Sequence, residues 1–444
     1  MKSFLACAAA VVALMGAAPV AVAADTQLRA DIARDYDQRL KDLFIDFHKY
    51  PELSFRETRT AARIAKELKA LGIQVTEGVG RTGVVGVLRN GEGPTVLIRA
   101  DMDGLPVEEK SGLPYASTVR QVDMNGKEMP VMHACGHDVH ITALLGTAKQ
   151  LVARKNQWKG TVVFVAQPAE EVISGAREML EDGLYTRFPR PNYAIGFHVS
   201  SDLPAGKVMV EPGLTYSSSD SVDIIVHGVG AHGASPHRGK DPIVIGSQIV
   251  LALQTLVSRE ISPLQPGVVT VGAFHSGLKH NIISDRAELQ LTVRSDDQEV
   301  REQLLAGIKR IAENVGRMAG LPEDKLPEVR YSTQSTPPTV NDPEATALVR
   351  AAILDQLGAE NLTTRPRTGM GAEDFAYYSQ RDPKVAGVYF AVGGTPQDVL
   401  DAAEAGGPPV PAHHSPLFKI TPEPAVKAGV EATTAAALTL LGKS

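Results

Sequence analysis

Cysteine is nearly absent from this chain, which holds 2 cysteines in 444 residues, Cys7 and Cys135. Cys7 lies in a leader that begins with Lys2, continues through an apolar run and ends in small residues, a pattern typical of a removable signal peptide over residues 1–24. We therefore expect an exported protein, periplasmic or secreted. Once the leader is removed, Cys135 cannot form an internal disulfide. Its thiol must be free, catalytic or bound to a metal ion.

Long apolar runs and basic clusters are also scarce. Beyond the leader, no segment reaches the roughly 18–20 uninterrupted apolar residues of a membrane span, so no span is predicted. The 45 Lys and Arg residues against 51 Asp and Glu give a formal net charge of −6, without a basic run suited to phosphates. Nucleic acid is therefore not an expected partner. The length exceeds what one hydrophobic core usually supports, which favours two domains.

Short β-rich segments alternate with helical patterns in the first half of the chain. This rhythm predicts an α/β fold in which helices cover a mixed sheet. The segment Ser54-Phe55-Arg56-Glu57 has the pattern of a capping box, which predicts a helix from there to Leu71. The other expected helices cover residues 27–49, 137–155 and 174–181, and the expected strands cover residues 84–88, 95–100, 161–166 and 193–197.

The rhythm changes from residue 214 onward to the order βαββαβ. This order predicts a small α+β lid or dimerisation domain, residues 214–334, inserted between the two parts of a larger domain, residues 25–213 and 335–444. The stretch Ala402–Ala412 is rich in Gly, Pro and Ala and predicts a loop that delivers His413 and His414. The lid elements are expected at residues 221–226, 242–259, 267–274, 286–294, 298–318 and 328–331.

The segment His133-Ala134-Cys135-Gly136-His137-Asp138 concentrates metal-binding residue types around one glycine. Thiolate and neutral imidazole are ligands that Zn²⁺ prefers, and carboxylates serve as further ligands or orient the imidazoles. Other candidates follow expected strands, where ligands of α/β sheets gather. The further candidate residues are Asp101, Asp103, Glu170, Glu171, His198, His413 and His414.

Two adjacent glutamates, Glu170 and Glu171, suggest a division of roles. One carboxylate can bind metal while its neighbour accepts a proton from water. A pair of metal ions about 3.5–4 Å apart needs one bridging ligand and roughly two terminal ligands for each ion. A second cluster, residues 228–237, surrounds His232 with small residues. That histidine is either a surface residue or a donor that polarises a carbonyl oxygen.

Several motifs occur together along nearly all of the mature chain. They are His48–Ser54, Arg99–Pro106, the Cys135 segment, Gln167–Glu171, Gly196–His198, the His232 cluster, Gly371–Phe375 and His414–Pro416. Through these motifs the chain resembles the aminoacylase/carboxypeptidase family of dinuclear metallopeptidases. Within that family it is most similar to the branch of hippurate hydrolases and auxin-conjugate amidohydrolases. Any one of these motifs alone would be weak evidence for the family, whereas the full set is highly specific for it.

The resemblance implies that Cys135 bridges two divalent metal ions in each subunit. Glu171 and His414 would complete one site. His137 and His198 would complete the other. The thiolate favours zinc, although Mn²⁺, Co²⁺ and Ni²⁺ also suit imidazole and carboxylate ligands.

The resemblance also implies roles for residues that do not bind metal. Glu170 would be the general base, and His232 would reach the substrate carbonyl from the lid of the partner subunit in a homodimer. Asp103 would support a ligand imidazole. Asn281 and Arg294 match family positions near the carboxylate of the substrate.

The chain departs from the branch pattern at residues 217–219, which are three serines, and at residues 282–284, Ile-Ile-Ser. These positions touch the hinge and the substrate side, so they bear on specificity rather than on catalysis. His413, next to the motif histidine, is expected to be a bystander.

The leading functional hypothesis is an amidohydrolase that cleaves N-acyl or N-aroyl L-amino acids, such as hippurate, to a carboxylic acid and a free amino acid. The alternative is a dipeptidase or carboxypeptidase that uses the same dinuclear site. A metal-free cysteine hydrolase with Cys135 as nucleophile and His137 as base is disfavoured by the many additional ligands. A non-catalytic binding protein with this fold is disfavoured because Glu170 and all five ligands are present.

Overall fold

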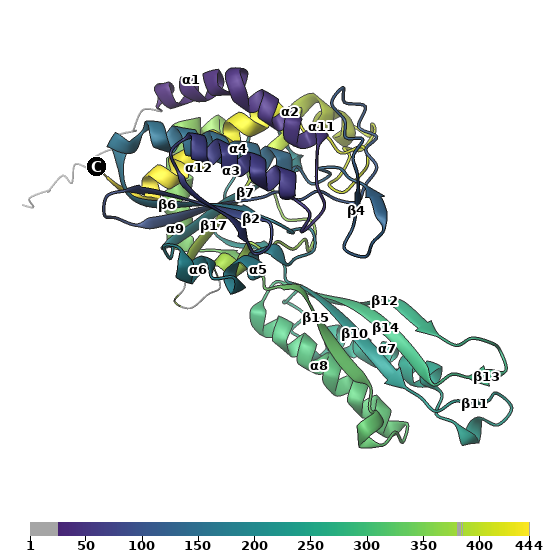
Figure 1. Ribbon diagram of the computed structural model, residues 1–444. Helices are drawn as coiled ribbons and strands as arrows, with labels where there is room; N and C mark the ends of the chain where they lie inside the picture. The colour runs from purple at the N-terminus through teal and green to yellow at the C-terminus, as the bar shows by residue number, and fades with distance from the viewer. Residues whose placement is uncertain (1–24, 380–382, 384, 444) are drawn as a thin grey trace, which may run out of the picture.

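A computed structural model describes residues 25–379, 383 and 385–443 of the chain. The expected signal peptide and Cys7 lie outside the described residues. Figure 1 shows a larger domain that contains the first and last described elements and an elongated arm that projects from it. We call the arm, residues 219–336, the lid. The fold class expected from the sequence, a helix-covered mixed sheet with an α+β lid, is confirmed.

The larger domain is built on one mixed sheet. Its strand order is β1-β2-β6-β3-β7-β17-β8, and β18 pairs with β6 outside this path. β3 runs parallel to both β6 and β7, and β7 runs parallel to β17. The carboxyl ends of these strands therefore meet at one edge of the sheet. The strands are β1 Gln74–Val79, β2 Gly83–Asn90, β3 Thr95–Asp101, β6 Trp158–Gln167, β7 Tyr193–Pro204, β8 Val208–Met209, β17 Ala386–Thr395 and β18 Gly442–Lys443.

Both faces of this sheet are covered, which explains why its central strands are almost continuously apolar. Along β6, Val162 and Phe164 enter one core, whereas Val163 and Val165 enter the core on the opposite face. The first face packs against α1 Thr26–Asp35, α2 Lys41–Lys49, α3 Thr58–Ala70, α4 His137–Ala153, α9 Pro343–Leu357 and α12 Pro422–Leu440. The second face packs against α5 Gly175–Glu181, α6 Leu184–Arg187 and α10 Ala376–Ser379.

The predicted capping box at Ser54 is wrong. Helix α3 begins at Thr58, and the Ser54 hydroxyl donates instead to Oδ2 of Asp103 at 2.6 Å. The free N–H groups of the first helical turn are satisfied by Glu52, whose carboxylate accepts from the backbone of Arg59 at 3.1 Å and Thr60 at 2.8 Å. A carboxylate earlier in the chain thus performs the capping, which also suits the positive end of the helix dipole.

The lid has the predicted βαββαβ order and its own hydrophobic core. Its antiparallel sheet has the strand order β12-β14-β10-β15, and two helices pack on one face of it. The elements are β10 Ser219–His227, α7 Pro242–Thr255, β12 Gly267–Ser276, β14 Arg286–Ser295, α8 Gln298–Met318 and β15 Glu328–Thr336. A small pair of strands, β11 Ala231–His232 and β13 Ile282–Ile283, lies at the end of the lid farthest from the larger domain (Figure 1).

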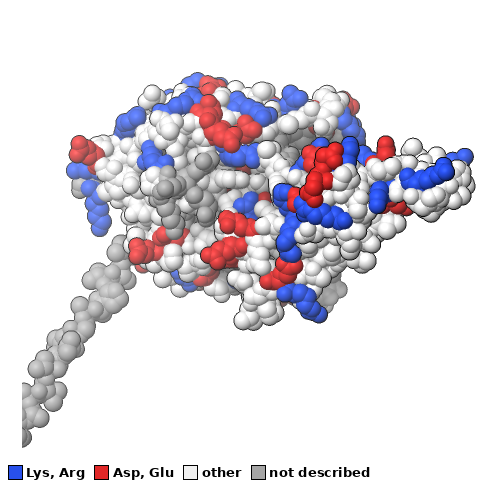
Figure 2. All heavy atoms as spheres, turned by 90° about the horizontal axis from the view of Figure 1, so that it is seen from below, with Lys and Arg blue, Asp and Glu red and all other residues white. Residues whose placement is uncertain are grey.

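The loop predicted over residues 402–412 is partly wrong, because α11 Gln397–Glu404 extends into it. Shorter elements complete the larger domain: β4 Arg120–Val122, β5 Glu128–Pro130, β9 Gly213–Tyr216 and β16 Thr339–Asn341. Among the described residues, one helical segment, Pro242–Glu260, is long and apolar enough to cross a membrane by length and composition. Its inner face, with Ile245, Ile249 and Leu253, packs in the lid core. Figure 2 shows basic and acidic residues interspersed over the face that it draws.

Candidate active site

The residues predicted at strand ends come together at one edge of the large sheet, although His198 lies inside β7, which continues to Pro204 instead of ending at residue 197. Cys135 and His137 stand on either side of Gly136, which directly precedes α4 and has a φ of 86°. A Cβ atom at Gly136 would lie 2.3 Å from Cγ1 of Val199, so both the backbone conformation and the space require glycine. This turn directs the thiol and one imidazole toward His198 on the neighbouring strand β7.

Cys135 belongs to two sets of potential metal ligands. Its Sγ lies 3.4 Å from Nε2 of His198, and the ligand atoms of Cys135, His137 and His198 all lie within 4.8 Å of one another. The ligand atoms of Cys135, Glu171 and His414 satisfy the same limit, with Nε2 of His414 lying 3.4 Å from Oε2 of Glu171. The structure therefore brings together all five residues assigned as metal ligands from the sequence, with the thiol common to both sets.

Hydrogen bonds orient the two buried imidazoles for metal binding. Nδ1 of His137 donates to the backbone oxygen of Asp103 at 2.9 Å, and Nδ1 of His198 donates to the backbone oxygen of Val199 at 2.7 Å. Because a carbonyl oxygen only accepts, each Nδ1 carries a proton, and in the neutral imidazole each Nε2 keeps a free lone pair for a metal ion.

Two buried polar atoms of the site have no hydrogen-bond partner in the described part of the chain. They are Nε2 of His137 and Oε1 of Glu171. Buried polar atoms without a partner are rare in folded proteins, and each needs an explanation. Both are electron-pair donors of the type that binds divalent cations. The residues present therefore fit a pair of divalent metal ions.

Asp103 holds the segment that carries the two glutamates. Its Oδ1 accepts from the backbone N–H of Glu170 at 3.1 Å, and its Oδ2 accepts from the backbone N–H of Glu171 at 3.1 Å. Its own backbone oxygen receives the proton of His137. Asp103 thus orients a ligand imidazole through its main chain, while its side chain fixes the neighbouring carboxylates.

Glu170 is buried beside this centre. Removal from water, followed by repulsion from Glu373 and Glu171, raises the pKa of Glu170 well above its ordinary value. A carboxyl group with a raised pKa takes up and releases a proton near neutral pH more readily than an exposed one. Glu170 lies next to Glu171 but belongs to neither set of ligands that contains Cys135. Its carboxylate is therefore suited to proton transfer.

Sequence reasoning missed a buried charge network behind the site. Arg99 is fully buried and pairs with Asp101 at 2.7 Å, Glu373 at 2.7 Å and Asp374 at 3.2 Å. Asp101 in turn contacts Nδ1 of His140 at 2.5 Å. A charged residue inside an otherwise apolar strand was the available signal, because arginine is almost never fully buried unless it is paired.

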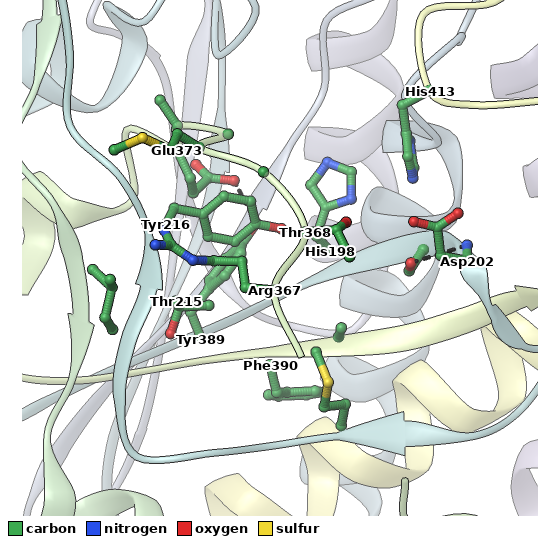
Figure 3. Close-up of a pocket in the computed structure, with 18 of the residues that line it drawn as sticks. His198, Asp202, Thr215, Tyr216, Arg367, Thr368, Glu373, Tyr389, Phe390 and His413 are labelled. Carbon is green, nitrogen blue, oxygen red and sulfur yellow. Dashed lines mark hydrogen bonds between the residues drawn. The ribbon is translucent and has the colours of Figure 1, made fainter. Parts of the chain in front are cut away.

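A cavity of about 750 Å³ opens beside the metal ligands. Figure 3 shows His198 and His413 on one side of it and Tyr216 and Arg367 across from them, with Phe390 at the far wall. The apolar part of the lining includes Leu203, Met209, Leu214 and Phe390. Three arginines also line the cavity: Arg294, Arg365 and Arg367.

These three arginines differ in their partners. Arg365 donates to the backbone oxygen of Asp202 at 2.6 Å, and Arg367 pairs with Asp296. Arg294, on β14 of the lid, makes no hydrogen bond or ion pair with any residue that the structure describes. Burial lowers its pKa from the ordinary value. It is the cavity guanidinium that is free to receive an anion.

Two predicted residues lie far from this cavity. His232 pairs with Ile282 across the small β11–β13 ladder, and the backbone N–H of Gly233 donates to the oxygen of Asn281 at 2.9 Å. This ladder lies at the distal end of the lid (Figure 1), and neither His232 nor Asn281 lines the cavity. Within one chain, the structure does not bring these two residues to the metal ligands.

The sequence profile of peptidase family M20/M25/M40 matches residues 97–404. The chain belongs to this family. Thermostable carboxypeptidase 1 of Saccharolobus solfataricus is 38% identical over 83% of this chain and 88% of its own length. The hippurate hydrolase of Campylobacter jejuni is 37% identical over 75% of this chain and 83% of its own length.

A solved structure of an M20 protein is similar to this chain over nearly its whole length. It is the YXEP protein of Bacillus subtilis, described as a dinuclear metal-binding peptidase, which is 29% identical with a TM-score of 0.72. The alignment covers 92% of this chain and 99% of the other. The family predicted from the motifs is thus confirmed, and this M20 chain is a hydrolase with a site suited to divalent metal ions.

Proposed function

We propose that this M20 hydrolase cleaves the amide bond of N-acyl and N-aroyl L-amino acids, releasing a carboxylic acid and a free amino acid. The observation that carries the proposal is the placement of Cys135 in both ligand sets with Glu170 beside them. Two ions held there would share the sulfur of Cys135 and have two further ligands each, and Glu170 would remain for proton transfer. The M20 relatives named hippurate hydrolase and thermostable carboxypeptidase agree with amide hydrolysis as the reaction type.

The chain's own residues account for the proton movements. Two divalent ions held by the five ligands would lower the pKa of water and withdraw electrons from the amide carbonyl. Glu170 then takes a proton from the attacking water and returns it to the leaving amine. His232 stabilises the developing negative charge on the carbonyl oxygen. Zn²⁺ is the favoured ion because of the thiolate, with Mn²⁺, Co²⁺ and Ni²⁺ as possible substitutes.

The lining of the cavity supports an acylated amino acid as substrate. Arg294 has no hydrogen bond or ion pair among the described residues, although it lies in the field of Asp220, so it is available to pair with the substrate's free carboxylate. The wall formed by Leu203, Met209 and Phe390 offers an apolar surface for the acyl group. An aromatic or aliphatic acyl group would displace water from this wall, which adds binding free energy in proportion to the apolar area covered.

A homodimer would bring His232 and Asn281 to a site, because both lie at the distal end of the lid in a single chain. The outer face of α7 supports this assembly. It exposes Ile243, Val244 and Leu251, with Leu251 73% exposed. Neighbouring exposed apolar side chains favour a protein partner. We propose a second copy of this chain as that partner, and export to the periplasm or exterior on the basis of the leader sequence.

A substrate panel tests the proposed reaction against its rival. Purified protein loaded with Zn²⁺ or Mn²⁺ would be given benzoyl-glycine, N-acetyl amino acids and unblocked dipeptides, and kcat/KM would be compared. We expect the acylated amino acids to be preferred. The relatives named carboxypeptidase support peptides as the second candidate class. A higher kcat/KM for dipeptides than for every acylated amino acid would establish that rival instead.

A further inference from the structure

His413, expected from the sequence to be a bystander, lies against the proposed bridging thiol. Its Nδ1 is 3.8 Å from Sγ of Cys135, which is within hydrogen-bonding distance for sulfur. On the opposite side of the ring, Nε2 accepts a hydrogen bond from the backbone N–H of Ser201 at 3.2 Å. A nitrogen that accepts carries no proton in a neutral imidazole, so the proton resides on Nδ1, which faces both Sγ and the backbone of Cys135.

The ring of His413 is fixed in this orientation by its neighbours. It packs at 39° against Phe418 with centroids 4.8 Å apart, and it meets the ring of His198 edge-on at 5.2 Å. Next to it, the backbone N–H of His414 donates to the oxygen of Ala134 at 2.8 Å, which ties this loop to the Cys135 segment.

The thiol needs such a donor. Cys135 is buried, and its sulfur lies in a cluster of ligand atoms that includes the carboxylate of Glu171. A thiolate at this position is therefore stable only when cations and hydrogen-bond donors face it. The other imidazole within reach of the sulfur is His198, which presents the unprotonated Nε2. Among the described residues, Nδ1 of His413 is the N–H group directed at Sγ.

We propose that His413 is a positioning residue that donates a hydrogen bond from Nδ1 to the metal-bridging thiolate of Cys135. The bond withdraws electron density from the sulfur and limits how strongly the thiolate donates to the two ions, an effect that hydrogen bonds to metal ligands commonly have. It also fixes the direction of the sulfur lone pairs. This inference rests on the proposed dinuclear site and adds to it a residue that acts through a ligand.

Cobalt spectroscopy of four proteins tests the proposal. The wild type is compared with His413→Phe and His413→Leu, which lack the donor, and with His413→Asn, whose side-chain N–H₂ can replace Nδ1. Each is loaded with Co²⁺, and the thiolate-to-cobalt charge-transfer band in the near ultraviolet is recorded with the metal stoichiometry. The phenylalanine variant preserves the ring packing against Phe418, so it separates the donor from the shape of the side chain.

We expect the band to move to longer wavelength in the Phe and Leu variants, because a thiolate without its hydrogen bond gives up electrons more easily. The Asn variant should return the band toward the wild-type wavelength. If the His413→Phe and His413→Leu proteins lose Co²⁺ and the His413→Asn protein retains it, the result also supports a hydrogen-bond donor at position 413. The proposal is overturned if the charge-transfer band of the His413→Phe or His413→Leu protein coincides with that of the wild type. It is also overturned if His413→Asn fails to restore a shifted band, or if all three variants lose Co²⁺.

The same experiment separates this inference from the proposed function. A wild-type protein that binds Co²⁺ with a thiolate band, but whose band is insensitive to position 413, retains the dinuclear site and loses only the role of His413. A wild-type protein that binds Co²⁺ without any thiolate band contradicts the bridging Cys135 itself.

Discussion

Arg99 and Glu373 form a fully buried ion pair, with Nη2 of the arginine 2.7 Å from Oε1 of the glutamate, although 274 residues separate them in the sequence. The same guanidinium contacts Asp101 and Asp374, and the hydroxyl of Tyr389 donates to Glu373 at 2.5 Å. One cation therefore contacts three acidic side chains directly behind the site. This network joins strand β3 to the Gly371–Phe375 segment and fixes both relative to the metal ligands.

Replacing Arg99 by methionine should destabilise the protein strongly. Loss of the cation leaves three buried carboxylates without a counter-charge, and breaking a buried pair typically costs about 3–5 kcal/mol. Chemical denaturation would measure the change in the free energy of unfolding. Lys69→Met is the matched control, because Lys69 pairs with Glu77 at the exposed surface, where a pair contributes about 0–1 kcal/mol. Similar unfolding free energies for the two variants would contradict this account.

Glu170→Gln should abolish most turnover while leaving metal binding intact. The amide cannot accept a proton, and removing a general base typically lowers kcat by about 10²–10⁴-fold. Elemental analysis should find the same metal content as in the wild type, because Glu170 is outside both sets around Cys135. Glu171→Gln, by contrast, should lose metal. Full turnover by a Glu170→Gln protein that retains its metal would remove the general-base assignment.

His48 should make stability depend on pH in the alkaline range. Burial opposes its charged form, but hydrogen bonds to Asp138 at 2.7 Å and Glu109 at 3.1 Å raise its pKa from 6.5 to about 9. Because the folded-state pKa is raised, the contribution is complete below pH 6.5 and is lost as the pH rises through about 9. The charged form of His48 contributes about 3 kcal/mol to the free energy of unfolding.

Thermal unfolding between pH 6 and 10 would measure this dependence. The wild type should lose stability over that window, and His48→Gln, which cannot titrate, should show a flatter profile. Parallel profiles for the two proteins would show that other groups cause the alkaline loss.

Much of the site could be predicted from the sequence because the sheet topology is readable. Asp103 and Glu170 follow strands with clear apolar patterns, and His198 lies within β7 just beyond its last pair with β3, so parallel strands bring the three residues to one edge. The metal ligands are also recognisable by residue type, since few positions combine Cys, His and Glu in this way.

Other features depend on partners that are distant in the sequence. The pattern at Ser54 is a capping signal, yet Glu52 takes that role and the serine contacts Asp103 instead. Likewise, the tautomer of His413 is set by Ser201, which lies 212 residues away. No local spacing rule contains such contacts, because they arise only when the larger domain is assembled.

Metal removal should inactivate and destabilise the protein. Without cations, His137 Nε2 and Glu171 Oε1 lie buried 3.8 Å apart, and neither has a hydrogen-bond partner among the described residues, which is unfavourable. Ligands that bind only the folded state stabilise it in proportion to the logarithm of their concentration, so Zn²⁺ should raise the melting temperature of chelated protein. Activity should disappear on exhaustive chelation and return with metal. Activity that survives chelation would favour a cysteine hydrolase with Cys135 as nucleophile.

Two inactive variants should restore activity when mixed, if His232 serves the partner's site. In a heterodimer of Glu170→Gln and His232→Ala chains, one site combines an intact Glu170 with an intact His232 from the other chain. Random exchange of subunits in a two-fold dimer should therefore recover up to about a quarter of wild-type activity. The mixture would be refolded or exchanged at low protein concentration and assayed on benzoyl-glycine. Leu251→Glu, placed in the exposed face of α7, is the control that should block recovery by preventing dimer formation. Absence of recovery in a mixture shown to contain heterodimers would mean that His232 does not serve the partner's site.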